Sequence, residues 1–221
     1  YTVLDNDAAS WQAGMRFYLT STFSVTADYG ESDTDFEPGA GDRSNSGDFW
    51  GVGVAWRRPK TGASISLRRS NLEPKEGSEF EGFEGDTWDA EISWSPREKF
   101  SLALYSRRNL SYTLDTEESF YVDERFGVRV GLGIGWRFRL NLFSEQGSLD
   151  YGEGKSSTSQ RSDDLLAWGA ELAFPVGQRF HISTGVKRTE VDSEFPGAGY
   201  RRNEIIGTFG FGGRGSGARW Y

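Results

Sequence analysis

Large apolar residues recur at every second position through much of this 221-residue chain. The segment DFWGVGVAWRR, residues 48–58, has the pattern in its simplest form, with an aromatic residue at each end of an apolar row. The large residues are Trp50, Val52, Val54 and Trp56, and the residues between them are Gly51, Gly53 and Ala55. A period of two is typical of β-strands, because successive side chains point to opposite faces of a sheet.

The same alternation predicts eleven strands, whereas no segment of helical length carries an apolar stripe at the i, i+3, i+4 spacing. The predicted strands are 11–19, 23–29, 50–56, 63–69, 88–94, 100–107, 126–138, 140–146, 166–174, 180–188 and 204–213. The longest of these, 126–138, alternates without interruption from Phe126 to Phe138.

The links between these strands alternate in length. Short links include LTST, RPKTG, SPREK, RFRL and PVGQ, whereas long polar links include ESDTDFEPGAGDRSNSGD, NLEPKEGSEFEGFEGD and DYGEGKSSTSQRSDD. Short turns at one end and long loops at the other indicate an up-and-down antiparallel meander, the arrangement of bacterial outer-membrane barrels.

The two faces of the predicted strands are inverted relative to a soluble protein. In a membrane barrel the bulky apolar side chains face lipid, aromatic side chains lie at the two interfaces, and small or polar side chains face the lumen. The predicted interface aromatics are Phe17, Trp50, Trp56, Trp88, Trp94, Trp136, Trp168 and Phe174. We therefore expect an all-β, transmembrane, up-and-down antiparallel barrel with 11 to 12 visible strands. The alternative is a soluble β-sandwich, barrel or lectin-like fold, in which the tryptophan rows would fill a core.

Composition narrows the function classes. The mean hydropathy of -0.61 is typical of soluble or disordered chains, but the 15% aromatic content argues against disorder. The chain has no cysteine, which excludes disulfides and thiolate metal sites, and its net charge of -8 disfavours a nucleic-acid partner. The glycine-rich GLGIG, residues 131–135, is followed by no helix and predicts no phosphate site, so its glycines give room or bend a strand. No cofactor is expected.

Charged residues of both signs alternate into the predicted lumen. The predicted lumen-lining residues are Arg68, Asp89, Glu91, Arg107, Arg129, Arg137, Arg139, Glu145, Glu171 and His181. Such a lining polarises a water-filled channel, and arginine forks can bind anionic sugar polymers. Alternatively, the charges pair with one another and stabilise or plug the lumen.

Two further chemistries have weaker sequence support. His181 is the only histidine and lies two residues from Ser183, a pair that an outer-membrane hydrolase could use. Chance alternation along a strand explains this pair more simply, so we expect no catalytic residues and no enzyme. Loop carboxylates could bind Ca²⁺ or share divalent ions with lipopolysaccharide, although no EF-hand spacing is present. These carboxylates are Asp115, Glu117, Glu118, Asp123, Glu124, Asp163 and Asp164.

Several segments resemble one known family. The segments YRRNEIIGTFGFG, SLRRS, YSRRN and FYVDERFGVRVGLGIGWRFRLNLFSEQGSLDY are similar to those of the putative β-barrel porin 2 family. The resemblance implies a barrel in the outer membrane of Gram-negative bacteria, in contact with lipid and lipopolysaccharide. Many members are encoded beside exopolysaccharide synthesis genes, which implies a port for polysaccharide export or hydrophilic solutes, working with periplasmic export proteins.

The chain departs from that family in its length. An odd number of strands is unexpected, because single-chain bacterial barrels have even numbers. We therefore expect residues 1–221 to form one outer-membrane barrel domain that is N-terminally incomplete, the C-terminal part of a larger barrel, unless one strand was missed. The alternative function is a structural barrel with a closed lumen that anchors a larger surface assembly.

Overall fold

The computed structural model describes residues 6–36, 44–78, 82–112, 120–135, 137–151, 161–176 and 180–211. The strands in these ranges are β1 (Asn6–Tyr18), β2 (Phe23–Phe36), β3 (Asn45–Arg57), β4 (Thr61–Pro74), β5 (Phe83–Arg97), β6 (Phe100–Tyr112), β7 (Phe120–Ile134), β8 (Phe138–Tyr151), β9 (Ser162–Val176), β10 (Phe180–Ser193) and β11 (Tyr200–Phe211). They follow one another in chain order in a single sheet, and each is antiparallel to the next. The predicted eleven strands and their up-and-down order are confirmed. Among the described residues, no helix is long and apolar enough to cross a membrane.

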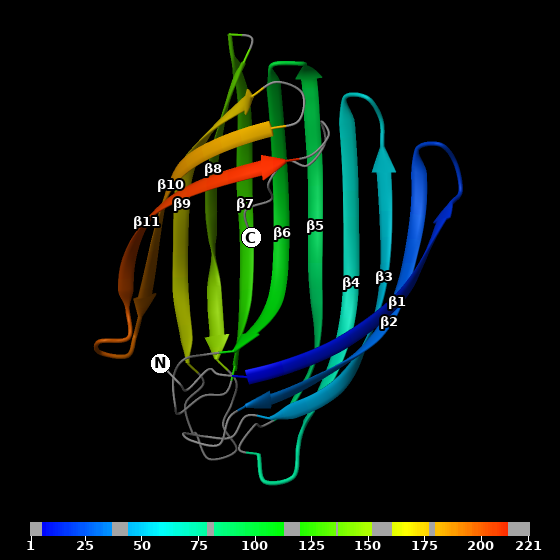
Figure 1. The fold of residues 1–221 in the computed structure, drawn as a ribbon. Coiled ribbons are helices and arrows are strands. Elements are labelled where there is room, and N and C mark those ends of the chain that lie inside the picture. Colours follow the sequence, from blue (N-terminus) through cyan, green and yellow to red (C-terminus); the bar gives the residue numbers. More distant parts are fainter. Residues whose placement is uncertain are drawn as a thin grey trace.

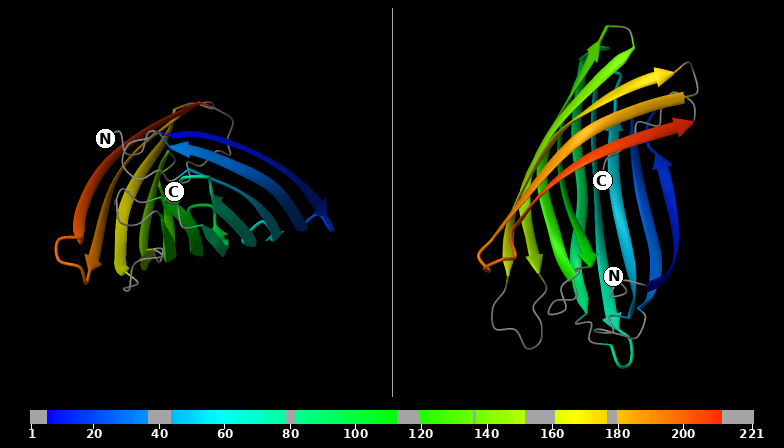
Figure 2. Two further views of the ribbon diagram at one scale, coloured as in Figure 1. Left: turned by 90° about the horizontal axis from the view of Figure 1, so that it is seen from below. Right: turned by 60° about the vertical axis from the view of Figure 1, so that its left-hand side comes forward.

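The sheet is strongly curved, as expected for a barrel wall (Figures 1 and 2). The short turns between β1 and β2, β3 and β4, and β5 and β6 lie along its upper end in Figure 1, and the strand ends that lead into the long links lie along its lower end. We call these the short-turn end and the long-loop end. Strands β1 and β11 form the two edges and do not pair with each other within the described residues, so the described sheet is open.

Most strands extend further toward the long-loop end than the alternation predicted. β2 was expected at 23–29 but continues to Phe36, and β3 begins at Asn45 rather than at 50. The backbone pairing continues through polar pairs such as Asp33 with Ser46, beyond the apolar row. Both faces are polar there, so the period of two disappears from the sequence although the strand persists.

One predicted strand boundary was wrong. The segment 126–138 was expected to be a single strand, but β7 ends at Ile134 and Phe138 is the first residue of β8. Gly135 has a φ of 62°, a left-handed conformation that ends the strand and that glycine adopts without strain. Ile134 and Phe138 then pair across the hairpin, so the apolar row continues on the same face but on the next strand.

Candidate functional site on the concave face

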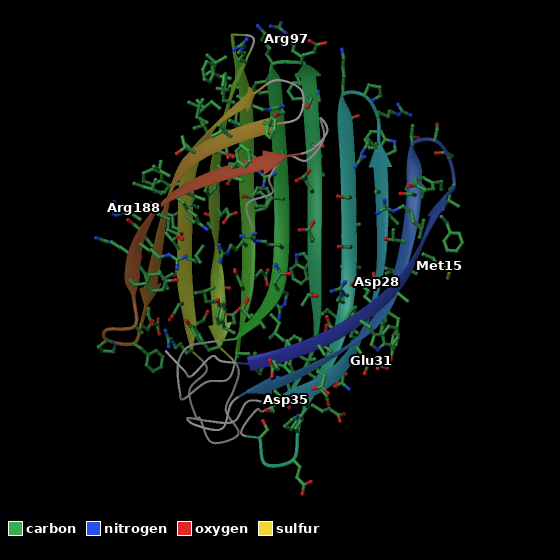
Figure 3. All side chains as sticks on the ribbon, viewed as in Figure 1. Met15, Asp28, Glu31, Asp35, Arg97 and Arg188 are labelled. Atoms are coloured by element: carbon green, nitrogen blue, oxygen red, sulfur yellow. The ribbon has the colours of Figure 1, made fainter. Side chains whose placement is uncertain are left out.

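The alternation places two different surfaces on the two sides of the sheet. Met15 and Arg188 point away from the sheet on its convex side, whereas Asp28 points into the concave side (Figure 3). Residues paired directly across neighbouring strands share a face, so the register extends this assignment along the sheet. Large apolar side chains such as Val52, Val54 and Leu67 are exposed on the convex, outer face. The concave, inner face carries the small and polar residues.

Inner-face glycines leave room for side chains that cross a strand. Gly51 pairs with Asp28 on one side and with Arg68 on the other, and these two form a 3.1 Å ion pair across it. A Cβ atom at Gly51 would lie 2.7 Å from the Asp28 carboxylate. Gly127 lies likewise between Tyr105 and Glu145. The small residues of the opening pattern therefore permit lateral contacts between alternate strands.

A buried charge network joins β6, β7 and β8 on the inner face. The Glu145 carboxylate accepts hydrogen bonds from the Tyr105 hydroxyl at 2.7 Å, from Arg107 at 3.3 Å and from Arg125 at 3.2 Å. Arg125 also donates a hydrogen bond of 2.5 Å to Asp123. Two arginines face two carboxylates, so the formal charges cancel, and Glu145 is only 5% exposed. This set is built to hold three strands together.

Apolar side chains also occupy part of the inner face near the long-loop end. A buried cluster joins Leu149, Leu165 and Val191 with Tyr151 and Ala167 on β8, β9 and β10. The register places these residues on the same face as Glu145 and Glu171. The expectation that small or polar side chains cover the inner face was therefore wrong for this region, where buried apolar side chains form a local core.

The predicted lumen-lining residues fall into three groups. Arg107 and Glu145 belong to the buried network, Arg68 pairs with Asp28, and Glu171 accepts a 3.2 Å hydrogen bond from Asn141. Arg129 and Glu91 lie 3.6 Å apart, and each side chain is about 40% exposed. The exposed residues are Asp89, Arg137 and Arg139, of which Arg139 donates to the Ser101 hydroxyl at 3.1 Å. Their role in lining a lumen stays a prediction.

The side chain of the tenth predicted residue, His181, lies outside the described residues. Ser183 is 3% exposed, and its hydroxyl has no hydrogen-bond partner among the described residues. The described part of the chain therefore gives no geometry for a histidine–serine pair.

The predicted interface aromatics that the structure describes lie on the outer face. Phe17, Trp50, Trp94 and Trp168 are about half exposed, whereas Trp56, Trp88 and Phe174 are more covered. Arg58 lies over the Trp56 ring, Arg108 lies over the Trp88 ring, and Phe138 stacks on Phe174. Trp136 lies outside the described residues, and the membrane-interface role of the whole set stays a prediction.

Some of the loop carboxylates proposed for ion binding lie outside the described residues, and most of the others are paired with arginines. Asp115, Glu117 and Glu118 lie outside the described residues. Asp123, Glu124 and Asp163 pair with Arg125, Arg108 and Arg161, while Asp164 is exposed. In the described ranges, no three His, Cys, Asp or Glu side chains are grouped to hold a metal ion.

The sequence reasoning missed a group of cations at the short-turn end. Arg16, Arg57 and Lys99 lie on the inner face beside the turns, and Arg97 lies at the upper rim (Figure 3). The sequence could have revealed this group, because the short links RRPK and PREK are basic, whereas the long links are rich in acidic residues.

Comparisons with known proteins point to a barrel family. The model of the family described as putative beta-barrel porin 2 matches residues 75–208, more than half of the chain. Among solved structures, the chain is similar to LpxR from Salmonella typhimurium, with 12% identity, a TM-score of 0.38, and 91% of this chain and 88% of that chain covered. It is also similar to the beta domain of the Bordetella autotransporter BrkA, with 14% identity, a TM-score of 0.31, and 94% and 89% covered. Comparison with curated proteins gave no match.

Proposed function

Because the chain belongs to the putative beta-barrel porin 2 family and lies in the bacterial outer membrane, we propose that it forms a channel for hydrophilic solutes. The observation that carries this proposal is the inner face of β1 to β5. Between the short-turn end and Arg68 this face carries glycine, alanine, serine and threonine, with charged side chains at intervals. A polar wall behind an apolar outer face is what a water-filled barrel requires.

The solute we propose is a polysaccharide leaving the cell. A sugar polymer needs many hydroxyl contacts of modest strength, because a channel must bind its cargo weakly enough to release it. The inner-face serines and threonines meet this requirement. The proposed partners are lipid and lipopolysaccharide around the outer face, the polymer within, and export proteins on the periplasmic side. We propose no catalytic role.

A closed barrel requires further strands between the two edges. β1 and β11 both run from the long-loop end toward the short-turn end, because eleven antiparallel strands place the first and last in the same direction. Exposed sheet edges are not tolerated in hydrocarbon. We propose that an odd number of additional strands closes the barrel with antiparallel pairing throughout, which corresponds to a domain larger than residues 1–221.

A second candidate function rests on β6 to β10. There the buried network around Glu145 and the apolar cluster at Leu165 and Val191 tie the wall together on its inner side. If such side-chain packing continued around the whole inner wall, the lumen would be closed to solutes. Such a barrel would serve as an anchor for a larger surface assembly.

Conductance in planar lipid bilayers separates these two functions. The protein purified from its native membrane should give steady open currents that polysaccharide reduces. Its intact mass, recorded on the same sample, should exceed 24.7 kDa if further strands complete the barrel. A silent protein that co-purifies with a stable partner would support the anchor and contradict the channel.

A further inference from the structure

Cations at the two ends of the sheet differ in their partners. At the long-loop end, Arg69 pairs with Glu84 at 2.7 Å and Arg108 pairs with Glu124 at 2.8 Å. Lys75 donates to Asp33 and, at 2.6 Å, to Asp35, and these hydrogen bonds raise the pKa of the Lys75 ammonium. The charges of these three described cations are thus neutralised by neighbouring carboxylates.

The short-turn end contrasts with this. Within the described residues, seven of its cations form no ion pair with a carboxylate: Arg16, Arg57, Arg58, Lys60, Arg97, Lys99 and Arg139. Glu98 is the acidic residue among these turns. The short-turn end therefore presents uncompensated positive charge, although the whole chain carries a net charge of -8.

Two of these arginines border a hollow on the inner face of β1 to β5. The hollow has a volume of about 390 Å³, and its lining includes Arg16, Tyr18, Arg57, Thr26, Ser64 and Ser66. Tyr18 is 72% exposed, so its ring is available for contact. The hydroxyls of Thr26, Ser64 and Ser66 form no hydrogen bond with other described residues. Asp89 also lines the hollow and can accept hydrogen bonds.

We propose that this hollow is a binding subsite for an acidic sugar unit, so that the exported polymer is anionic. This proposal rests on the proposed channel function and specifies its cargo. Arg16 and Arg57 bind the carboxylate or other anionic group through their planar donor forks. The free hydroxyls and Asp89 exchange hydrogen bonds with the sugar hydroxyls, and Tyr18 offers a ring face at the rim.

The position of the arginines favours a polymer in the lumen over an anionic lipid headgroup. Arg57 lines the hollow on the inner face, away from the apolar surface. The next residue, Arg58, lies over the Trp56 ring on the outer face at 5.4 Å. A headgroup site would be expected at Arg58, and a lumenal site at Arg57. The two adjacent arginines thus form a matched pair for a test.

The test uses the full protein from its native membrane and two probes of equal length. One probe is a tetramer of galacturonic acid, and the other is the same tetramer reduced to its neutral galactose form. Binding is measured by calorimetry in detergent micelles, and block of current is measured in planar bilayers. The variants are the Arg16→Gln/Arg57→Gln double variant and the Arg58→Gln control.

We expect the acidic tetramer to bind the unmodified protein at least tenfold more tightly than the neutral one. The double variant should lose about tenfold of this affinity, and Arg58→Gln should lose none. Equal affinity for both tetramers, no binding of either, or equal losses in the two variants would overturn the proposal. Because calorimetry needs no open channel, a silent protein that still prefers the acidic tetramer would contradict only the channel function.

Discussion

The Tyr105 hydroxyl on β6 donates a 2.7 Å hydrogen bond to Glu145 on β8, across Gly127 of the intervening β7. The contact is available because Gly127 has no side chain on the inner face. A Cβ atom there would lie 2.4 Å from Tyr105 Cζ. A methyl group at this position would therefore collide with the Tyr105 ring and disturb its contact with Glu145.

The Gly127→Ala substitution should destabilise the barrel. The added methyl group displaces the Tyr105 ring, and overpacking of this kind costs about 1–3 kcal/mol. Urea-titrated refolding into lipid vesicles measures the change. Gly207→Ala is the control, since no atom lies within 4 Å of a Cβ placed there. If both variants lost similar stability, the crossing of Tyr105 over Gly127 would not be the cause of the destabilisation.

Removal of the Glu145 charge should be far more costly than removal of an exposed partner. The Glu145→Gln variant leaves Arg107 without its carboxylate in a buried site, which costs about 3 kcal/mol or more. In Glu84→Gln, the exposed pair with Arg69 is lost, and such pairs are worth about 0–1 kcal/mol. The same refolding titration compares them. Comparable urea midpoints of refolding for the two variants would contradict the assignment of Glu145 to a buried structural network.

The apolar outer face gives a third prediction. Val54 lies between Trp50 and Trp56 on the outer face, and Ala55 lies on the inner face. Val54→Lys places a charge in lipid and should cost about 2–4 kcal/mol near the bilayer midplane. Ala55→Lys should be tolerated, because its ammonium group reaches water. If the refolding titration showed that both changes are equally tolerated, the assignment of the outer face to lipid would be contradicted.

Much of this fold follows from the sequence because the two faces have opposite chemistry. Wherever an apolar row faces lipid, as from Trp50 to Trp56, a period of two marks the strand and assigns each residue to a face. Beyond the apolar row, as at Asp33 and Ser46, both faces are polar and strand length cannot be read from the alternation. The turn after Ile134 was missed because Gly135 is one of several glycines in a regular pattern, and only its backbone conformation distinguishes it.

The candidate site was less predictable for a different reason. Alternation assigned Glu145 and Arg68 to the inner face, but their surroundings depend on register across three strands. Glu145 is buried because Tyr105 crosses Gly127, and Arg68 is paired because Asp28 lies beyond Gly51. Glycines in the sequence indicated room for side chains, but not which side chains would use it.

Cysteine accessibility tests the central claim most directly, since the chain has no cysteine of its own. Ser66 lies on the inner face in the hollow, and its neighbour Leu67 lies on the outer face with 47% of its surface exposed. In membranes, the Ser66→Cys variant should react with a charged, membrane-impermeant thiol reagent and lose current, while the Leu67→Cys variant should be protected by lipid. Reaction of both at the same rate, or protection of Ser66→Cys, would contradict a water-filled lumen behind a lipid-facing wall.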